Sequence, residues 1–194
     1  MNFFDFCSLY LQASIKTEGM KDSNPGITIV PYSPVYHEGC MAAFISNVPK
    51  FFTLEEIEQY KDWLNYLETL PEVPGKLPPS IYYVVLLGTE VIGCGGFGYD
   101  ETTHQATLAW GLVHNSYHKQ YIGSKLLAFR LDKIAALNPA AEILLDTTQH
   151  AYPFFERHGF VIQKFTPDSY AIGMHRYDMK WTGKTHTPDP GIVF

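Results

Sequence analysis

The order of the strand-like and helix-like segments constrains this chain more than any other feature. Three apolar, β-rich runs at 81–87, 91–99 and 105–113 follow one another with only short turns between them. Helix and strand patterns then alternate, over 123–136, 142–148, 152–158, 160–165 and 175–181. Hairpin strands followed by alternating helices and strands predict one mixed sheet with helices on its faces.

One strand and two helices are predicted before this block. Residues 27–30 alternate as a strand does, and residues 36–46 are compatible with a short helix. Thr53 and Glu56 have capping-box spacing at the start of a longer amphipathic run, which ends at Pro71. We expect a single domain over 27–182, an N-terminal leader at 1–26 and a C-terminal tail at 183–194.

Composition excludes several classes of protein. With 46% hydrophobic and 18% charged residues over 194 positions, the chain can build a core and is not disordered. A net charge of −6 argues against nucleic-acid binding, and no apolar run approaches the roughly 20 residues of a membrane span. The three cysteines, Cys7, Cys40 and Cys94, have no paired spacing, which favours reduced thiols in a cytoplasmic protein.

Two motifs match known sites by spacing alone. Gly93 to Gly98 reads G-x-G-x-x-G, but a dinucleotide fingerprint must open a helix, and this stretch reads as strand. We expect its small residues to let another group pack close to the backbone. His114 and His118 have the spacing of a zinc pair, which requires a helix that the sequence does not predict there. No metal site is expected.

The stretch from Thr107 to Lys125 carries the most chemical information. It reads as a strand, a short polar loop and the start of a helix. The first turn of a helix exposes unpaired N–H groups and the positive end of the helix dipole, a geometry that binds phosphate. Gly123 would leave the backbone bare, and Lys119 and Lys125 add positive charge. The alternative is an ordinary strand-to-helix turn.

Two segments resemble the GNAT N-acetyltransferase superfamily, whose members use acetyl-CoA. The family carries R/Q-x-x-G-x-G/A in the loop before the helix, where this chain has His118, Tyr121 and Gly123 at the three motif positions. Residues 154–160, Phe-Phe-Glu-Arg-His-Gly-Phe, are similar to the family's F-Y-E-K-x-G-F. The resemblance covers residues 27–182.

The resemblance implies an α/β (α+β) fold with a mostly antiparallel sheet of about six to seven strands and helices on both faces. Its central parallel pair, 105–113 and 142–148, would be splayed and would admit acetyl-CoA. Backbone N–H near Trp110 or Gly111 would face the thioester oxygen. The residues implied to contact the cofactor are Leu112, Val113, His118, Lys119, Gln120, Tyr121, Ile122, Gly123, Ser124, Gln149 and Phe155.

Two departures from the family pattern bear on this site. Tyr121 replaces a glycine, so either the cofactor loop is altered or Tyr121 is helical with its ring turned outward. Phe155 stands where many relatives carry the tyrosine that protonates the leaving thiolate.

The implied reaction transfers the acetyl group of acetyl-CoA directly to an amine of a small molecule or peptide. An alkyl amine is mostly protonated at neutral pH, so a general base helps. Glu101 and His104 are the candidates, with solvated turn residues as the alternative, and His114 is less favoured. Tyr152 is the candidate acid, with water as the alternative. The competing hypothesis is a GNAT-fold module that binds acyl-CoA, or nothing, and serves sensing or interaction.

The acceptor side and the assembly are less constrained by the sequence. Aromatic residues at 51, 52, 60, 63 and 66 either line an acceptor pocket or belong to the core. No nucleic-acid or membrane partner is expected. The 175–181 strand could lie at a sheet edge and pair with a second copy in a homodimer.

Overall fold

The computed structural model describes residues 26–71, 74 and 76–183. The predicted leader before Gly26 and tail after Gly183 lie outside the described residues. The strands are β1 Ile27–Pro31, β2 Ser80–Leu87, β3 Glu90–Asp100, β4 Gln105–Val113, β5 Glu142–Thr147, β6 Phe160–Ala171 and β7 Met174–Trp181. The helices are α2 His37–Ile45, α3 Glu56–Thr69, α4 Ile122–Leu137 and α5 Tyr152–Arg157, with short 3-10 turns η1 Pro34–Tyr36 and η2 Asn115–Tyr117.

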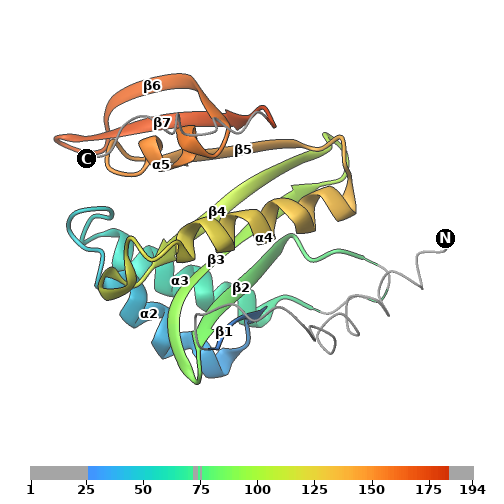
Figure 1. The fold of residues 1–194 in the computed structure, drawn as a ribbon, viewed down its shortest axis with the longest axis vertical. Coiled ribbons are helices and arrows are strands. Elements are labelled where there is room, and N and C mark those ends of the chain that lie inside the picture. Colours follow the sequence, from blue (N-terminus) through green and yellow to red (C-terminus); the bar gives the residue numbers. More distant parts are fainter. Residues whose placement is uncertain (1–25, 72–73, 75, 184–194) are drawn as a thin grey trace.

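The strands form a seven-stranded sheet in the order β1-β2-β3-β4-β5-β7-β6. All neighbours are antiparallel except β4 and β5, which are parallel and pair only from Gln105↔Glu142 to Thr107↔Leu144. Beyond these three positions the two strands diverge, so the sheet opens as a V (Figure 1). The predicted mixed, mostly antiparallel sheet with a splayed central parallel pair is confirmed.

Helices cover both faces of the sheet, as predicted. On one face, α2 and α3 pack Phe44, Tyr60 and Leu64 onto the strands in a buried cluster that includes Cys94. On the other face, Leu127 and Ile134 of α4 share a core with Phe160 and the rings of α5. Successive strand residues point to opposite faces, so Cys94 faces α2 and α3 while its neighbour Gly95 faces α4.

The predicted capping box forms at the start of α3. The Glu56 carboxylate accepts from the Thr53 backbone N–H at 2.7 Å, and the Thr53 hydroxyl accepts from the Glu56 N–H at 3.3 Å. These reciprocal bonds satisfy two N–H groups that the helix leaves open. They also fix the loop between α2 and α3, which forms part of the site described below.

The predictions for the C-terminal strands need two corrections. β6 extends to Ala171, beyond the predicted 160–165, because β7 continues to pair with it as far as Thr166↔Arg176 and again at Ala171↔Met174. The prediction that the 175–181 strand lies at a sheet edge is wrong, since β7 pairs with β5 on one side and β6 on the other. No helix in the described part of the chain has the length and apolar character needed to cross a bilayer.

Candidate active site

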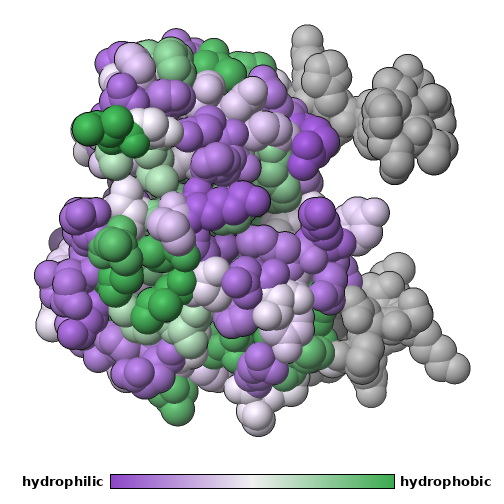
Figure 2. All heavy atoms as spheres, turned by 90° about the vertical axis from the view of Figure 1, so that its left-hand side faces the viewer, coloured by the Kyte–Doolittle hydropathy of each residue, from purple (hydrophilic) through white to green (hydrophobic). Residues whose placement is uncertain are grey.

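The opening between β4 and β5 is a cavity of about 1660 Å³. Its walls are β4, the end of β5, the start of α4, α5, the loop between α2 and α3, and the end of β6. The volume exceeds the range of about 300–1,000 Å³ of ordinary small-molecule pockets, so one long ligand and a second small one fit together. Figure 2 looks onto the open side, where hydrophilic side chains cross the middle of the face.

A β-bulge interrupts β4 in the middle of this cavity. On β3, Cys94 pairs with Leu112 and Gly96 with Ala109, so Trp110 and Gly111 together oppose the single residue Gly95. Trp110 has φ +42°, an unusual value for a residue with a side chain. Because pairing with β5 ends at Thr107, the β4 backbone from Leu108 onward has no strand partner on the side of the cavity.

A buried polar group holds the bulge on the α2–α3 face. The Tyr82 hydroxyl donates to the Trp110 carbonyl at 2.9 Å, and Tyr60 lies within hydrogen-bond distance of Tyr82 and of the Cys94 thiol. Burial raises the pKa of both tyrosines well above the ordinary value, so both stay neutral. The Trp110 carbonyl is thereby tied to the core.

The start of α4 lies at the wide end of the cavity. Tyr121 caps the helix without a side-chain hydrogen bond, and no acidic residue occupies the first turn. The N–H groups of this turn and the positive end of the 16-residue helix are therefore available to an anion. Lys119 and Arg157 line the same cavity and add positive charge.

Tyr121, which replaces the first glycine of the family motif, has its ring in solvent and a left-handed backbone. Its ring is 80% exposed, in line with one of the two alternatives, but its backbone is left-handed (φ 60°, ψ 6°) rather than helical. The loop therefore keeps the conformation that suits glycine, and the side chain turns outward instead of filling the opening. A left-handed conformation costs a residue with a Cβ roughly 1–2 kcal/mol.

Tyr121→Gly is expected to raise the free energy of unfolding, by up to about 1 kcal/mol, because glycine relieves this strain. Urea denaturation measures the change. Tyr66→Gly is the matched control, since Tyr66 is a half-exposed tyrosine inside α3. There glycine should lower stability by about 1 kcal/mol. A loss of stability in both variants would contradict the strain at Tyr121.

Two histidines at the wide end have fixed orientations. His118 Nε2 donates to the Val113 carbonyl at 2.9 Å, because a carbonyl can only accept. His158 Nδ1 donates to the Phe154 carbonyl at 2.8 Å, which leaves Nε2 of the neutral ring to accept from the Ser124 hydroxyl at 3.0 Å. Ser124, in the first turn of α4, is thus positioned by α5.

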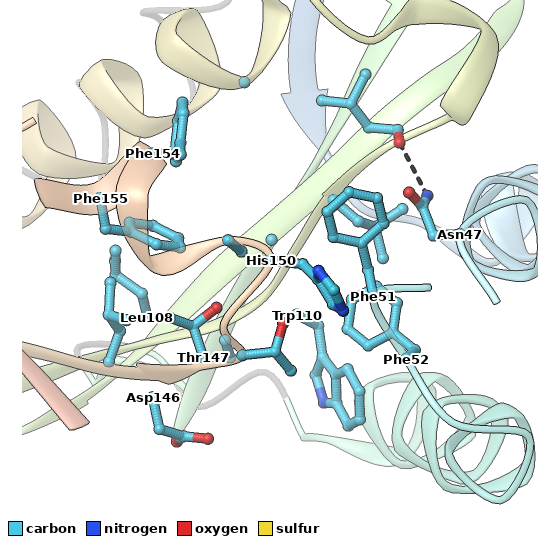
Figure 3. Close-up of a pocket in the computed structure, with 18 of the residues that line it drawn as sticks. Asn47, Phe51, Phe52, Leu108, Trp110, Asp146, Thr147, His150, Phe154 and Phe155 are labelled. Carbon is cyan, nitrogen blue, oxygen red and sulfur yellow. Dashed lines mark hydrogen bonds between the residues drawn. The ribbon is translucent and has the colours of Figure 1, made fainter. Parts of the chain in front are cut away.

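The loop between α2 and α3 closes one side of the cavity. Asn47 is buried and donates to the Val113 carbonyl at 2.9 Å, which ties the loop to the end of β4 (Figure 3). The Phe51 ring lies 5.5 Å from the His118 ring and 6.1 Å from the His150 ring, measured between centroids. Phe51 therefore spans the opening between the loops that follow β4 and β5.

The opposite end of the cavity is acidic. Glu55, Glu56 and Asp146 line it together with Tyr170, near the end of β6. Tyr170 donates a hydrogen bond to Asp146, and burial followed by that bond raises the pKa of the phenol. Arg176 lies 3.5 Å from the Asp146 carboxylate, so Asp146 is already committed to two partners.

His150 is the lining residue best placed to exchange a proton. It follows β5, it is exposed and lines the cavity, and its ring lies beside the Phe51 ring (Figure 3). Neither ring nitrogen has a hydrogen-bond partner among the described residues. An imidazole nitrogen without a hydrogen-bond partner can accept a proton from a substrate.

Arg130 lies under the bulge on the α4 face. An ideal Cβ on Gly111 would lie 2.8 Å from both terminal nitrogens of Arg130, and one on Gly95 would lie 3.1 Å from Nη1. The guanidinium thus occupies the space that side chains at these positions would fill. This confirms that the glycines of β3 admit a group close to the backbone.

The cavity collects most of the residues predicted to contact the cofactor. Gly111 and the nine residues Leu112, Val113, His118, Lys119, Tyr121, Ile122, Gly123, Ser124 and Phe155 line it. Gln120 and Gln149 do not, because Gln120 turns back to the Ser116 carbonyl and Gln149 bonds Gly173 and His175 at the β6–β7 turn.

The three predicted proton-transfer residues do not line the cavity. Glu101 and His104 lie before β4, where β4 and β5 are still paired, and the cavity opens at the other end of these strands. Glu101 borders a separate, smaller hollow with Tyr99 and Asp100. Tyr152, the first residue of α5, stacks on Tyr177 with a centroid distance of 4.3 Å and packs against the core.

Several lining residues were not predicted from the sequence. Arg130 carries the clearest signal in retrospect, because it is a charged residue on the apolar face of α4, four positions from both Leu126 and Ile134. The others lie in loops, on β5 and β6 or at the end of α5, and they follow no periodic pattern: Asn47, Asp146, His150, Arg157, His158 and Tyr170.

A splayed parallel pair, a bulge beside it and an uncapped helix start together define the GNAT fold. Residues 78–162 match the family model described as an acetyltransferase (GNAT) domain. The resemblance inferred from the sequence is thereby confirmed over these residues. No curated protein matches the sequence.

Solved structures of GNAT proteins share this fold at low sequence identity. An acetyltransferase of the GNAT family from Desulfovibrio desulfuricans is 16% identical, with a TM-score of 0.67 over 82% of this chain and 100% of that one. The ribosomal-protein-S18-alanine N-acetyltransferase of Escherichia coli is 15% identical, with a TM-score of 0.61 over 87% and 100%. An aminoglycoside 6'-N-acetyltransferase complexed with coenzyme A is 18% identical, with a TM-score of 0.60 over 84% and 99%.

Proposed function

We propose that the protein is an acetyl-CoA-dependent N-acetyltransferase that acts on an amine of a small molecule or peptide. The observation that carries the proposal is the single cavity in which the unpaired edge of β4, its bulge and the uncapped start of α4 meet. A coenzyme A pyrophosphate suits the N–H groups of α4, and an extended pantetheine arm suits the free β4 edge.

The other end of the cavity suits the acceptor. Glu55, Glu56 and Asp146 favour a cationic substrate, and an amine arrives protonated. The solved relatives named above include N-acetyltransferases whose names specify an aminoglycoside and an alanine of ribosomal protein S18 as acceptors. These names support an amine as the acceptor group. They do not specify whether a small molecule or a peptide bears that amine in this case.

The reaction needs few groups from the protein. The amine nitrogen attacks the thioester carbonyl, the carbon–sulfur bond breaks, and an amide and the coenzyme A thiolate result. Backbone N–H at the Trp110–Gly111 bulge stabilises the oxyanion, and His150 accepts the proton that the amine nitrogen loses. Phe155 supplies no proton, and a thiolate is a good enough leaving group to depart without one.

Isothermal calorimetry with acetyl-CoA and coenzyme A tests the proposal first, and thiol release with a panel of amines tests it second. Binding followed by turnover supports the enzyme. Binding without turnover on any amine favours the alternative, a GNAT-fold module that binds acyl-CoA for sensing. Absence of binding would overturn the cofactor assignment.

Gly123→Ala separates the cofactor role of α4 from its structural role. An ideal Cβ on Gly123 would meet the Phe154 ring at 3.6 Å and the Val113 Cγ2 at 3.9 Å, which are ordinary contacts. Alanine in a helix should therefore raise the free energy of unfolding by up to about 1 kcal/mol. The added methyl group lies in the first turn of α4, which lines the cavity, so we expect coenzyme A affinity to fall about 10-fold or more. Tighter or unchanged binding would contradict the phosphate site.

A further inference from the structure

Arg130 is a buried cation that has no carboxylate partner among the described residues. Arg130 is 3% exposed, and the one hydrogen bond that it makes to the described residues runs from Nη1 to the Gly96 carbonyl at 3.3 Å. Nε has no partner, and no carboxylate of the described residues pairs with the guanidinium. A charge buried in this way costs stability, so an unpaired one calls for a functional explanation.

The position of the Arg130 guanidinium, in the cavity and against the bulge, suggests such a function. Arg130 lines the cavity between Leu126 of α4 and the bulge of β4, and its guanidinium lies against Gly111 and Gly95. Tyr82 holds the bulge from the opposite face through the Trp110 carbonyl. The strained peptide groups of Trp110 and Gly111 are therefore fixed between a hydroxyl on one face and a cation on the other.

We propose that Arg130 is a positioning residue for acyl transfer, which holds the Trp110–Gly111 bulge in place and sets a positive charge beside the thioester, where it favours departure of the thiolate. The inference rests on the proposed function. The sulfur takes on negative charge as the carbon–sulfur bond breaks, and a fixed cation in a dry site stabilises that charge strongly.

The groups that face Arg130 leave its charge in place. Burial lowers the pKa of Arg130 to about 10, so it remains protonated at neutral pH. Tyr82 of β2 is neutral. Burial opposes ionisation of Cys94 on β3, but hydrogen bonds from its neighbours and the charge of Arg130 outweigh burial, and the pKa of the thiol is lowered. Cys94 faces α2 and α3, across the sheet from the guanidinium. The titratable groups on the other walls of the cavity are Glu55, Glu56, Lys50, Tyr117, His118, Lys119, Tyr121, Asp146, His150, Arg157, His158 and Tyr170.

The thiol pKa of bound coenzyme A reports the charge directly. The ultraviolet absorbance of the thiolate is titrated with pH in the complex, with S-methyl coenzyme A as the baseline because it has no thiol proton. We expect Arg130→Met to raise this pKa by about one unit and to lower kcat by about 100-fold. The KM for acetyl-CoA should change by less than about threefold, since the phosphate site is untouched.

Two further variants separate charge from packing. Arg130→Lys keeps the charge on an unbranched side chain and should keep the thiol pKa within about half a unit of the wild-type value. It also serves if Arg130→Met does not fold. Lys133→Met removes one cation from the same helix, beside the Phe129 ring, and should leave both the thiol pKa and kcat unchanged.

The outcomes distinguish this inference from the proposed function. If coenzyme A binds and the thiol pKa is the same in the wild type, Arg130→Met and Lys133→Met, the inference is wrong while the cofactor assignment stands. If Arg130→Met does not fold, Arg130→Lys is measured instead. If coenzyme A bound to Arg130→Lys then has the same thiol pKa as free coenzyme A, the inference is also wrong. If coenzyme A does not bind the wild type, both fall.

Discussion

His150→Ala is expected to lower kcat/KM for amine acetylation by about 100-fold or more at neutral pH. The imidazole lines the same cavity as the bulge, and neither of its nitrogens is hydrogen-bonded within the described part of the chain, whereas Asp146 already binds Tyr170 and Arg176. Steady-state rates across pH measure the effect.

The controls for His150 come from the same chain. His104→Ala and Glu101→Gln alter the residues that the sequence favoured, and both should keep activity within about twofold, because neither lines the cavity. Added imidazole should restore part of the activity of His150→Ala, since this side chain is exposed to the cavity. Full activity of His150→Ala, or loss of activity in His104→Ala, would return the base role to the start of β4.

The contrast between His150 and His104 shows what a sequence can and cannot predict about such a site. Local patterns predicted the strands, the capping box and the helix starts, because these depend on neighbours along the chain. Which residue can serve as the general base depends on which end of the β4–β5 pair opens. Pairing from Gln105 to Thr107 closes the end near His104, and this register is a long-range property that periodicity does not contain.

The cofactor end of the site was more predictable than the acceptor end. Residues 118–124 are contiguous, and a loop that enters a helix has the same backbone chemistry in every protein. The acceptor end is assembled from the α2–α3 loop, β5 and the end of β6, which are far apart in the sequence. Phe51 and Phe52 line the cavity, Phe52 also packs against the core, and Tyr60 belongs to the buried core.

The glycines of β3 were predictable in part from the sequence. Their number indicated close approach of another group, and the group at Gly95 is Arg130, which no local pattern could supply. Gly96 faces the other way and meets a different neighbour. An ideal Cβ there would lie 2.1 Å from the Ile81 carbonyl oxygen and 2.9 Å from the Tyr82 Cα, both backbone atoms of the paired strand β2.

Gly96→Ala is therefore expected to lower the free energy of unfolding by about 3 kcal/mol or more, because β2 itself must move to admit the methyl group. Against a typical stability of about 5–15 kcal/mol, this loss leaves a marginal fold, and urea denaturation with circular dichroism measures it. Gly98→Ala is the matched control on the same strand, since its Cβ meets only the Pro79 carbonyl oxygen, at 3.1 Å. Its loss should stay within about 1 kcal/mol. Equal midpoints for the two variants would show that β2 yields easily, and the glycine at position 96 would then need another explanation.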